Sequence, residues 1–156
     1  MRTQQQFLNE YAVSHRNPAN QLIHFFCVPI IFFSSAGLLW LIPLGKWLGL
    51  APDTAYWVNG ATVFGVFAAL FYLKMSVTSL LDMTVWFAVS VAGIVAIHQF
   101  GNGILFGVSA ALWVAAWVVQ VWGHKIEGAK PSFADDMVFL LIGPLFVMHE
   151  LREKMR

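Results

Sequence analysis

Residues 22–44 read LIHFFCVPIIFFSSAGLLWLIPL, a run of 23 residues without aspartate, glutamate, lysine or arginine. A helix needs about 20 apolar residues to cross the hydrocarbon core of a bilayer. Three further apolar runs of comparable length follow, at residues 55–73, 83–100 and 103–122. The sequence therefore predicts an all-α membrane protein with about four transmembrane helices.

The composition supports a single integral membrane domain over residues 1–156. Hydrophobic residues make up 59% of the chain and charged residues only 11%, whereas about a quarter of the residues in soluble domains are charged. The lone cysteine rules out an internal disulfide, and a net charge of +1 gives no support for nucleic-acid binding. Residues 1–20 lack the apolar core of a secretory signal peptide, so none is expected.

Two shorter segments flank the four runs. Residues 4–14 carry Phe7, Leu8 and Tyr11 on one helical face, which predicts an N-terminal amphipathic helix at the membrane interface. Residues 137–148 are apolar but number only 12 and contain Gly143-Pro144, so they predict a short re-entrant or interfacial helical segment. Gly101-Asn102-Gly103 predicts a turn that folds the third and fourth runs into an antiparallel hairpin.

The distribution of basic residues predicts the orientation. With four spans, both termini and the loop at residues 74–82 lie on one side of the membrane. Eight of the nine lysines and arginines fall on that side, and only Lys46 falls on the other. Because basic residues favour the cytoplasmic side, we expect both termini in the cytoplasm. The membrane would be the inner membrane of a bacterium or the endoplasmic reticulum of a eukaryote.

Polar residues gather where the first and last runs meet the cytoplasmic face. His15 and His24 come just before and inside the first run, and His124 and Glu127 come at the end of the fourth. Such side chains are costly at the edge of hydrocarbon unless each has a partner. Because the topology brings all four to one face, they predict a metal site there, with these residues as catalytic ligands.

The local sequence also predicts supporting residues around this site. Asn17-Pro18 predicts a helix start, with Asn17 as the N-cap. Asn20 and His24 then share a helical face, as do Gln120, His124 and Glu127 on the other helix. We expect substrate-binding or supporting roles for five residues: Tyr11, Arg16, Asn17, Asn20 and Gln120.

The ligand types leave more than one chemistry open. Neutral imidazoles with a carboxylate suit both non-haem Fe(II) oxygenases and zinc hydrolases. His98, near the far end of the third run, is expected at the opposite face, and the sequence does not fix the depth of His149. Two other classes are a small b-haem membrane protein with histidine ligands from facing helices, and a non-enzymatic membrane lipid-binding protein.

Two stretches resemble the signatures of a known family. The first is Tyr11-x3-His15-x-Asn17-Pro18-x-Asn20-x3-His24-x4-Pro29, and the second is Trp117-x2-Gln120-x2-Gly123-His124-x2-Glu127-x3-Pro131, followed by Gly143-Pro144-Leu145-Phe146. Together they resemble the membrane 2-hydroxy fatty acid dioxygenases, which include a fungal enzyme of phytosphingosine breakdown and bacterial relatives. The resemblance covers essentially the whole chain.

The resemblance implies an enzyme with Fe(II) as its cofactor and O2 as co-substrate. Its reaction is α-oxidation, in which a long-chain 2-hydroxy fatty acid loses C1 and becomes a fatty acid one carbon shorter. The family's ligand histidines map onto His15, His24 and His124. Val28 stands where the family pattern has glycine, and His149 stands at an aliphatic position. Burial of the alkyl tail among the spans implies affinity with little selectivity for chain length, and the choice between free acid and CoA ester stays open.

Overall fold

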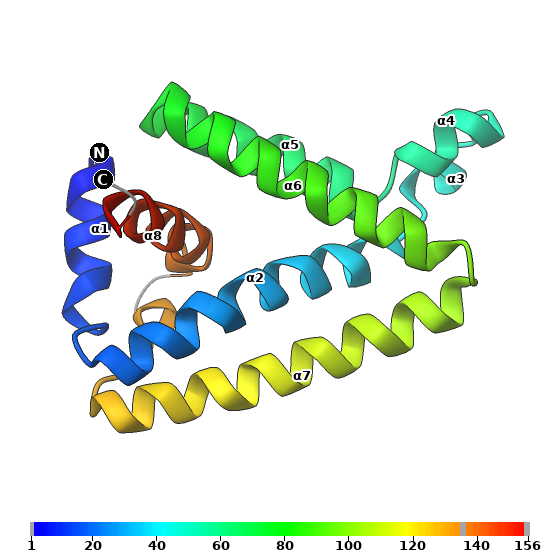
Figure 1. Cartoon of the computed structure of the whole chain (residues 1–156). Coiled ribbons are helices and arrows are strands. Elements are labelled where there is room, and N and C mark those ends of the chain that lie inside the picture. The colour runs from blue at the N-terminus through cyan, green and yellow to red at the C-terminus, as the bar shows by residue number, and fades with distance from the viewer. Residues whose placement is uncertain (1, 135–136, 155–156) are drawn as a thin grey trace.

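The computed structural model describes residues 2–134 and 137–154, and their regular structure is helical throughout (Figure 1). The helices are α1 (Gln4–Val13), α2 (Pro18–Trp40), α3 (Leu44–Trp47), α4 (Pro52–Trp57), α5 (Gly60–Met75), α6 (Val77–His98), α7 (Asn102–Glu127) and α8 (Phe139–Lys154), with a short 3-10 helix, η1 (Ser132–Ala134), before α8. The all-α class predicted from the sequence is confirmed.

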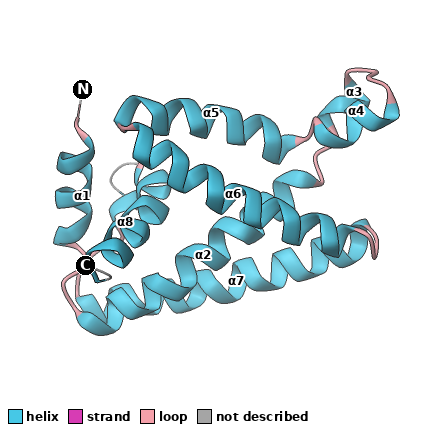
Figure 2. Cartoon of the chain, turned by 45° about the horizontal axis from the view of Figure 1, so that its top comes forward, coloured by secondary structure: helices cyan, strands magenta, loops and turns pink. Residues whose placement is uncertain are grey.

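Helices α2, α5, α6 and α7 form two antiparallel pairs. Helix α2 packs along α7, and α5 packs along α6; the two pairs converge at one end and spread at the other (Figures 1 and 2). The close approach of α2 and α7 requires Gly123, because a Cβ there would lie 2.5 Å from Asn20 Oδ1. Gly37 makes a similar close contact with Ser109 farther along the same interface. Small residues thus bring these two helices together, as is common in membrane proteins.

Within the described residues, three helical segments are long and apolar enough to cross a membrane. They are Pro18–Trp47, which includes α2 and α3, Val77–His98 and Asn102–Glu127. The predicted second span, residues 55–73, is divided, because the Asn59 side chain accepts the N–H groups of Ala61 and Thr62 and begins a new helix there. Helix α5 therefore has only 16 residues, fewer than a spanning helix usually needs.

The turn between the third and fourth predicted runs is present. Helix α6 ends at His98, α7 begins at Asn102, and Gly101 adopts a φ of 107°, which favours glycine. The pairing of these helices differs from a simple hairpin. Helix α7 packs mainly against α2 rather than α6, because the glycines of the α2–α7 interface allow the closer approach.

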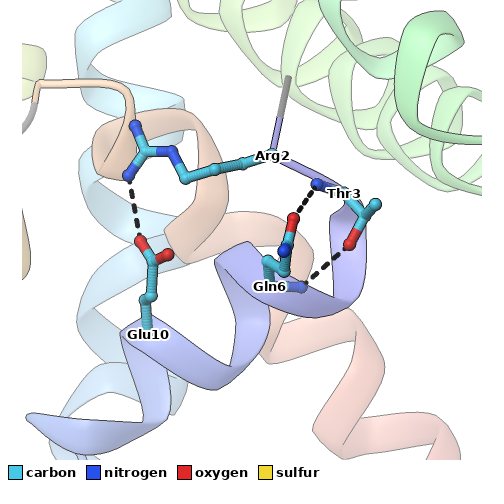
Figure 3. A network of polar contacts seen from close by, with 4 residues as sticks. All are labelled: Arg2, Thr3, Gln6 and Glu10. Atoms are coloured by element: carbon cyan, nitrogen blue, oxygen red, sulfur yellow. Dashed lines mark hydrogen bonds and ion pairs between the residues drawn. The ribbon is translucent and has the colours of Figure 1, made fainter.

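The predicted N-terminal helix is present as α1. Its start is a capping box in which the Gln6 N–H donates to Thr3 Oγ1 and the Thr3 N–H donates to Gln6 Oε1 (Figure 3). Arg2, which precedes the helix, pairs with Glu10 of α1 at 2.9 Å. The apolar face of α1, which includes Phe7, is buried against α8.

Helix α8 is longer than the predicted segment at residues 137–148. It runs from Phe139 to Lys154 and passes through Pro144 without ending there. Ile142 and Phe146 are buried against α1, and Leu145 packs against α5 and α6. An ion pair from Arg152 to Asp82 also ties α8 to α6. Helix α8 thus fills the space between the spread ends of the two helix pairs.

Candidate metal centre

Three histidines meet at the end of the α2–α7 pair. His15 lies in the turn between α1 and α2, His24 in the second turn of α2, and His124 in the last turn of α7. Their potential ligand atoms all lie within 4.8 Å of one another, and their ring centroids are 4.2 to 5.0 Å apart. All three side chains are buried. The structure therefore brings together the three histidines that the sequence places at one face.

Backbone hydrogen bonds determine which ring nitrogen two of these histidines present. His15 Nδ1 lies 2.6 Å from the Tyr11 carbonyl oxygen, and His24 Nδ1 lies 3.0 Å from that of Asn20. Because a carbonyl only accepts, each Nδ1 carries the proton and each Nε2 keeps its lone pair. Both Nε2 atoms and His124 Nδ1 are buried without a hydrogen-bond partner.

This set of unpartnered nitrogens fits a metal ion. A buried acceptor left unsatisfied costs about 1–3 kcal/mol, and imidazole nitrogen is a good ligand for iron and zinc. Burial lowers the pKa of the His15 imidazole to about 4, so this ring is in the neutral, ligand-competent form at pH 7. The carbonyls bonded to the Nδ1 atoms are the kind of partner that orients metal-binding histidines.

Glu127 lies beside the three histidines rather than among them. Its Oε1 accepts the Arg16 N–H at 2.9 Å, and its Oε2 accepts the Asn17 N–H at 2.9 Å and the Asn20 side-chain N–H at 3.1 Å. Among the described residues, the group able to hold a metal consists of the histidines alone. In the structure, Glu127 therefore ties the end of α7 to the turn that carries His15.

The predicted supporting residues near this turn have distinct environments. Asn17 caps α2 by accepting the Ala19 N–H at 2.9 Å, as predicted. Asn20 is fully buried, and its side-chain N–H also lies 3.3 Å from the Ser14 carbonyl oxygen. Arg16 is exposed and contributes its backbone N–H to the Glu127 contact. Asn17 and Asn20 thus shape the turn, and Arg16 contributes to it through its backbone.

Tyr11 and Gln120 flank the histidines. The Tyr11 ring stacks on the His15 ring, with centroids 3.9 Å apart and planes inclined by 7°. Gly143 of α8 permits this arrangement, because a Cβ there would lie 3.3 Å from the Tyr11 hydroxyl oxygen. Gln120 is buried one turn before His124, and its Oε1 has no partner. Both side chains are available to a molecule bound next to the histidines.

The remaining two histidines lie outside the group. His98 is at the opposite end of the bundle, where its Nε2 lies 2.6 Å from Asn102 Oδ1 and its Nδ1 lies 3.4 Å from the Tyr56 hydroxyl. This agrees with the depth predicted for His98. His149 is partly buried in α8 and does not belong to the metal-competent group.

A cavity of about 630 Å³ extends from the histidines into the helix bundle. Polar side chains line one end of it: Tyr11, His15, Gln120, His124 and Ser132. The rest of the lining is mostly apolar, comes from α2, α5, α6, α7 and α8, and reaches Leu39 and Ala61. This volume is typical of small-molecule sites. A ligand with a polar head and a long apolar tail matches the lining.

Sequence comparisons agree with the geometry. A model of the family described as "2-hydroxy-palmitic acid dioxygenase Mpo1-like" matches residues 1–155. The chain belongs to the Mpo1-like family. A curated relative, the 2-hydroxy-palmitic acid dioxygenase MPO1 of Saccharomyces cerevisiae, is 29% identical over 150 residues, which cover 95% of this chain and 79% of the relative. No solved structure matches this Mpo1-like chain significantly. The family resemblance carried by the two motifs is confirmed.

Sequence reasoning missed several contacts of this Mpo1-like site. The Gln21 side chain donates to the His15 carbonyl oxygen at 2.8 Å, and the Ser132 hydroxyl lies 2.7 Å from that of Ser14. Phe146 of α8 packs near His15, with the two ring centroids 5.9 Å apart. Gln21 lies six residues after His15, in the first turn of α2, and no sequence pattern signals this contact. Ser132 belongs to no motif, and only the fold brings it to the site.

Proposed function

We propose that this protein is a membrane-bound non-haem Fe(II) dioxygenase that carries out α-oxidation of long-chain 2-hydroxy fatty acids. One observation carries the proposal: three buried histidines hold unpartnered nitrogens close together, and two of them, His15 and His124, line the polar end of an otherwise apolar cavity. The substrate class comes from the name of the yeast relative, a 2-hydroxy-palmitic acid dioxygenase. A protein that only binds lipid would not need unpartnered imidazoles at the head of its cavity.

The proposed reaction balances with O2 as the only oxidant. The C1–C2 bond breaks, C1 leaves as carbon dioxide, and C2 becomes the carboxyl carbon of the shorter acid. One oxygen atom of O2 enters the products as carboxyl oxygen, and the other leaves as water. Because the substrate supplies all the electrons, no 2-oxoglutarate or other co-reductant is required.

The three histidines are the proposed iron ligands. Bound Fe(II) would supply the activation of O2, as in other non-haem iron oxygenases with protein ligands on one face and open positions on the other. The carbonyls of Tyr11 and Asn20 hold His15 and His24 in the tautomer that presents Nε2 to this site. Glu127 acts in this proposal as a positioning residue, through the turn it holds.

The polar end of the cavity would bind the substrate head. In this proposal Gln120 Oε1 would accept a hydrogen bond from the hydroxyl of a 2-hydroxy acid, and the Tyr11 hydroxyl would donate one to its carboxylate. The apolar walls beyond them would exclude water from the reacting carbons. An unsubstituted acid lacks one of these polar groups, and loss of such a contact can cost several powers of ten in kcat/KM.

We propose in addition that α5 crosses the bilayer together with the three longer helices. This topology puts both termini in the cytoplasm with the basic residues Arg2, Lys74 and Lys125, while Lys46 of α3 lies at the opposite end of the bundle (Figure 1). Terminal tags should be accessible to protease only from the cytoplasmic side. A C-terminal tag accessible from the other side would contradict the topology.

Metal analysis of protein purified without oxygen tests the cofactor. We expect iron bound to the protein and a visible spectrum without a Soret band. A haem between these histidines is disfavoured, because rings 4.2 to 5.0 Å apart leave no space for a macrocycle. A Soret band would contradict the proposal, and so would tightly bound zinc in a protein whose activity does not depend on iron.

A further inference from the structure

The cavity is elongated along α2. Its α2 lining includes Ile31, Ser35 and Leu39, which follow one another at four-residue spacing on one helical face. Val28 is the first residue of α2 in the lining, and Leu39 comes eleven residues later, about 16 Å farther at the rise of an α-helix. This distance, together with the polar end of the cavity, is comparable with the length of an extended palmitoyl chain.

Small residues of α5 make room along the opposite wall. Ala61, Gly65 and Ala69 recur every four residues, and all three line the cavity. Gly65 faces α6, where an added Cβ would come within 2.9 Å of the Phe87 ring. The eight residues from Ala61 to Ala69 correspond to about 12 Å along the helix, so the three positions sample three depths.

The end of the cavity distant from the histidines is closed by packed side chains. Ala36 and Ala61 line it there and are buried in a cluster with Trp40, Ile94 and Leu105. The side of the cavity is more open. Phe64 of α5 and Trp113 of α7 line it there, and they are 48% and 38% exposed. A tail could therefore enter sideways from the bilayer and still meet a wall at its methyl end.

We propose that this cavity holds the alkyl tail of a single-chain fatty acid lengthwise and that Leu39 and Ala61 at its far end set the chain length. The inference rests on the proposed function for the placement of the head at the histidines, where Gln120 Oε1 is buried, unpartnered and adjacent to the cavity. This proposal differs from the sequence-based expectation of little selectivity for chain length. That expectation assumed a tail lying among loosely packed spans, where its methyl end would meet no wall.

Substitutions at two depths test this assignment. Ala69→Leu fills the cavity about two helical turns closer to the histidine end than Ala61, and Leu39→Phe fills it at the far end. Ala115→Leu is the matched control, since Ala115 lies on the exposed face of α7 outside the cavity lining. Each variant is assayed with saturated 2-hydroxy acids of increasing length. Ala69→Val is the milder variant if Ala69→Leu does not accumulate in membranes.

The expected result is a graded change in length preference. Ala69→Leu should lower kcat/KM for palmitoyl-length acids by about tenfold or more, the effect of a misplaced methylene in an apolar pocket, while short acids are still turned over. Leu39→Phe should affect only the longest acids, and Ala115→Leu should have the wild-type profile. Length profiles that stay parallel in all variants, with turnover intact, would overturn the inference.

A binding measurement separates this inference from the proposed reaction. Unsubstituted fatty acids of the same lengths are added to metal-depleted protein, and the rise in its thermal unfolding temperature is recorded. The variants should show the same order of length preference as in the kinetic assay. Graded stabilisation without any chain shortening would contradict the proposed reaction alone, whereas stabilisation that does not change with length or variant would contradict the cavity assignment.

Discussion

The Glu127 carboxylate accepts the backbone N–H of Asn17 at 2.9 Å, and this contact joins residues 110 positions apart in the chain. It fastens the C-terminal end of α7, which carries His124, to the turn that carries His15. The same carboxylate reaches Arg16 and Asn20. The geometry of the three histidines therefore depends on a carboxylate that is not itself in their group.

Glu127→Gln should weaken metal binding without abolishing it. The amide has the size of the carboxylate, but its N–H groups oppose the donors from Asn17 and Asn20. Loss of a residue that orients metal ligands typically costs about 10–100-fold in metal affinity, and titration of the purified variant with Fe(II) measures this. Asn20→Ala should reproduce part of the loss, because Asn20 shares Glu127 Oε2. Unchanged Fe(II) affinity in both variants would show that the hydrogen bonds of Glu127 do not support the metal site.

The histidines should separate into two classes on substitution. His15→Ala, His24→Ala and His124→Ala should each abolish bound iron and activity in protein that still reaches the membrane. His98→Ala is the matched control and should keep most of its iron, because His98 lies at the opposite end of the bundle. Iron content per protein after anaerobic purification distinguishes the classes. Equal iron loss in His98→Ala and His124→Ala would contradict the assigned site.

Gly123→Ala should destabilise the protein, whereas Gly107→Ala on the same helix should not. A Cβ at Gly123 would lie 2.5 Å from Asn20 Oδ1 and 3.2 Å from Ile23, while a Cβ at Gly107 would meet nothing within 4 Å. Overpacking of this kind costs about 1–3 kcal/mol, and replacing an exposed helical glycine by alanine gains up to about 1 kcal/mol. Thermal unfolding in detergent compares the two variants. If both behave alike, the close α2–α7 contact does not contribute to stability.

The fold was predictable where a local pattern determines it. The apolar runs predicted α2, α6 and α7, and Asn17-Pro18 predicted the start of α2, because length, hydropathy and capping are properties of neighbouring residues. The division of residues 55–73 depended on Asn59, whose capping contacts compete with a continuous helix. The length of α8 was missed because the predicted segment followed the apolar run and ended at Met148, whereas the helix continues through the charged residues that follow, to Lys154.

The candidate site was predictable to a similar degree. Topology placed His15, His24 and His124 at one face, and the structure brings their potential ligand atoms within 4.8 Å of one another. The contacts of Glu127 were not predictable, since helical spacing put its side chain on the face of His124 but said nothing about the backbone N–H groups of a distant turn. The cavity was also beyond reach of sequence patterns, because residues of six α-helices form it together: α1, α2, α5, α6, α7 and α8.

The 2-hydroxyl group should be required for turnover. The unsubstituted acid lacks an oxygen beside the carboxylate, and in the 3-hydroxy isomer the oxygen is not on the carbon that becomes the new carboxyl. Both should therefore react at least about a hundredfold more slowly than the 2-hydroxy acid, since loss of a required hydroxyl contact costs several powers of ten. Competition assays with equal concentrations of the three acids measure the preference. Equal turnover of all three would contradict the proposed binding of the head.

Product analysis under defined conditions tests whether the protein shortens 2-hydroxy fatty acids by one carbon. Purified protein is supplied with Fe(II), O2 and a long-chain 2-hydroxy fatty acid, without 2-oxoglutarate, and oxygen uptake is recorded while the acids are identified by mass spectrometry. We expect one O2 to be consumed for each acid shortened by one carbon, and no shortening by His124→Ala. Iron-loaded wild-type protein that leaves the acid unchanged, or shortening that persists in His124→Ala, would contradict this expectation.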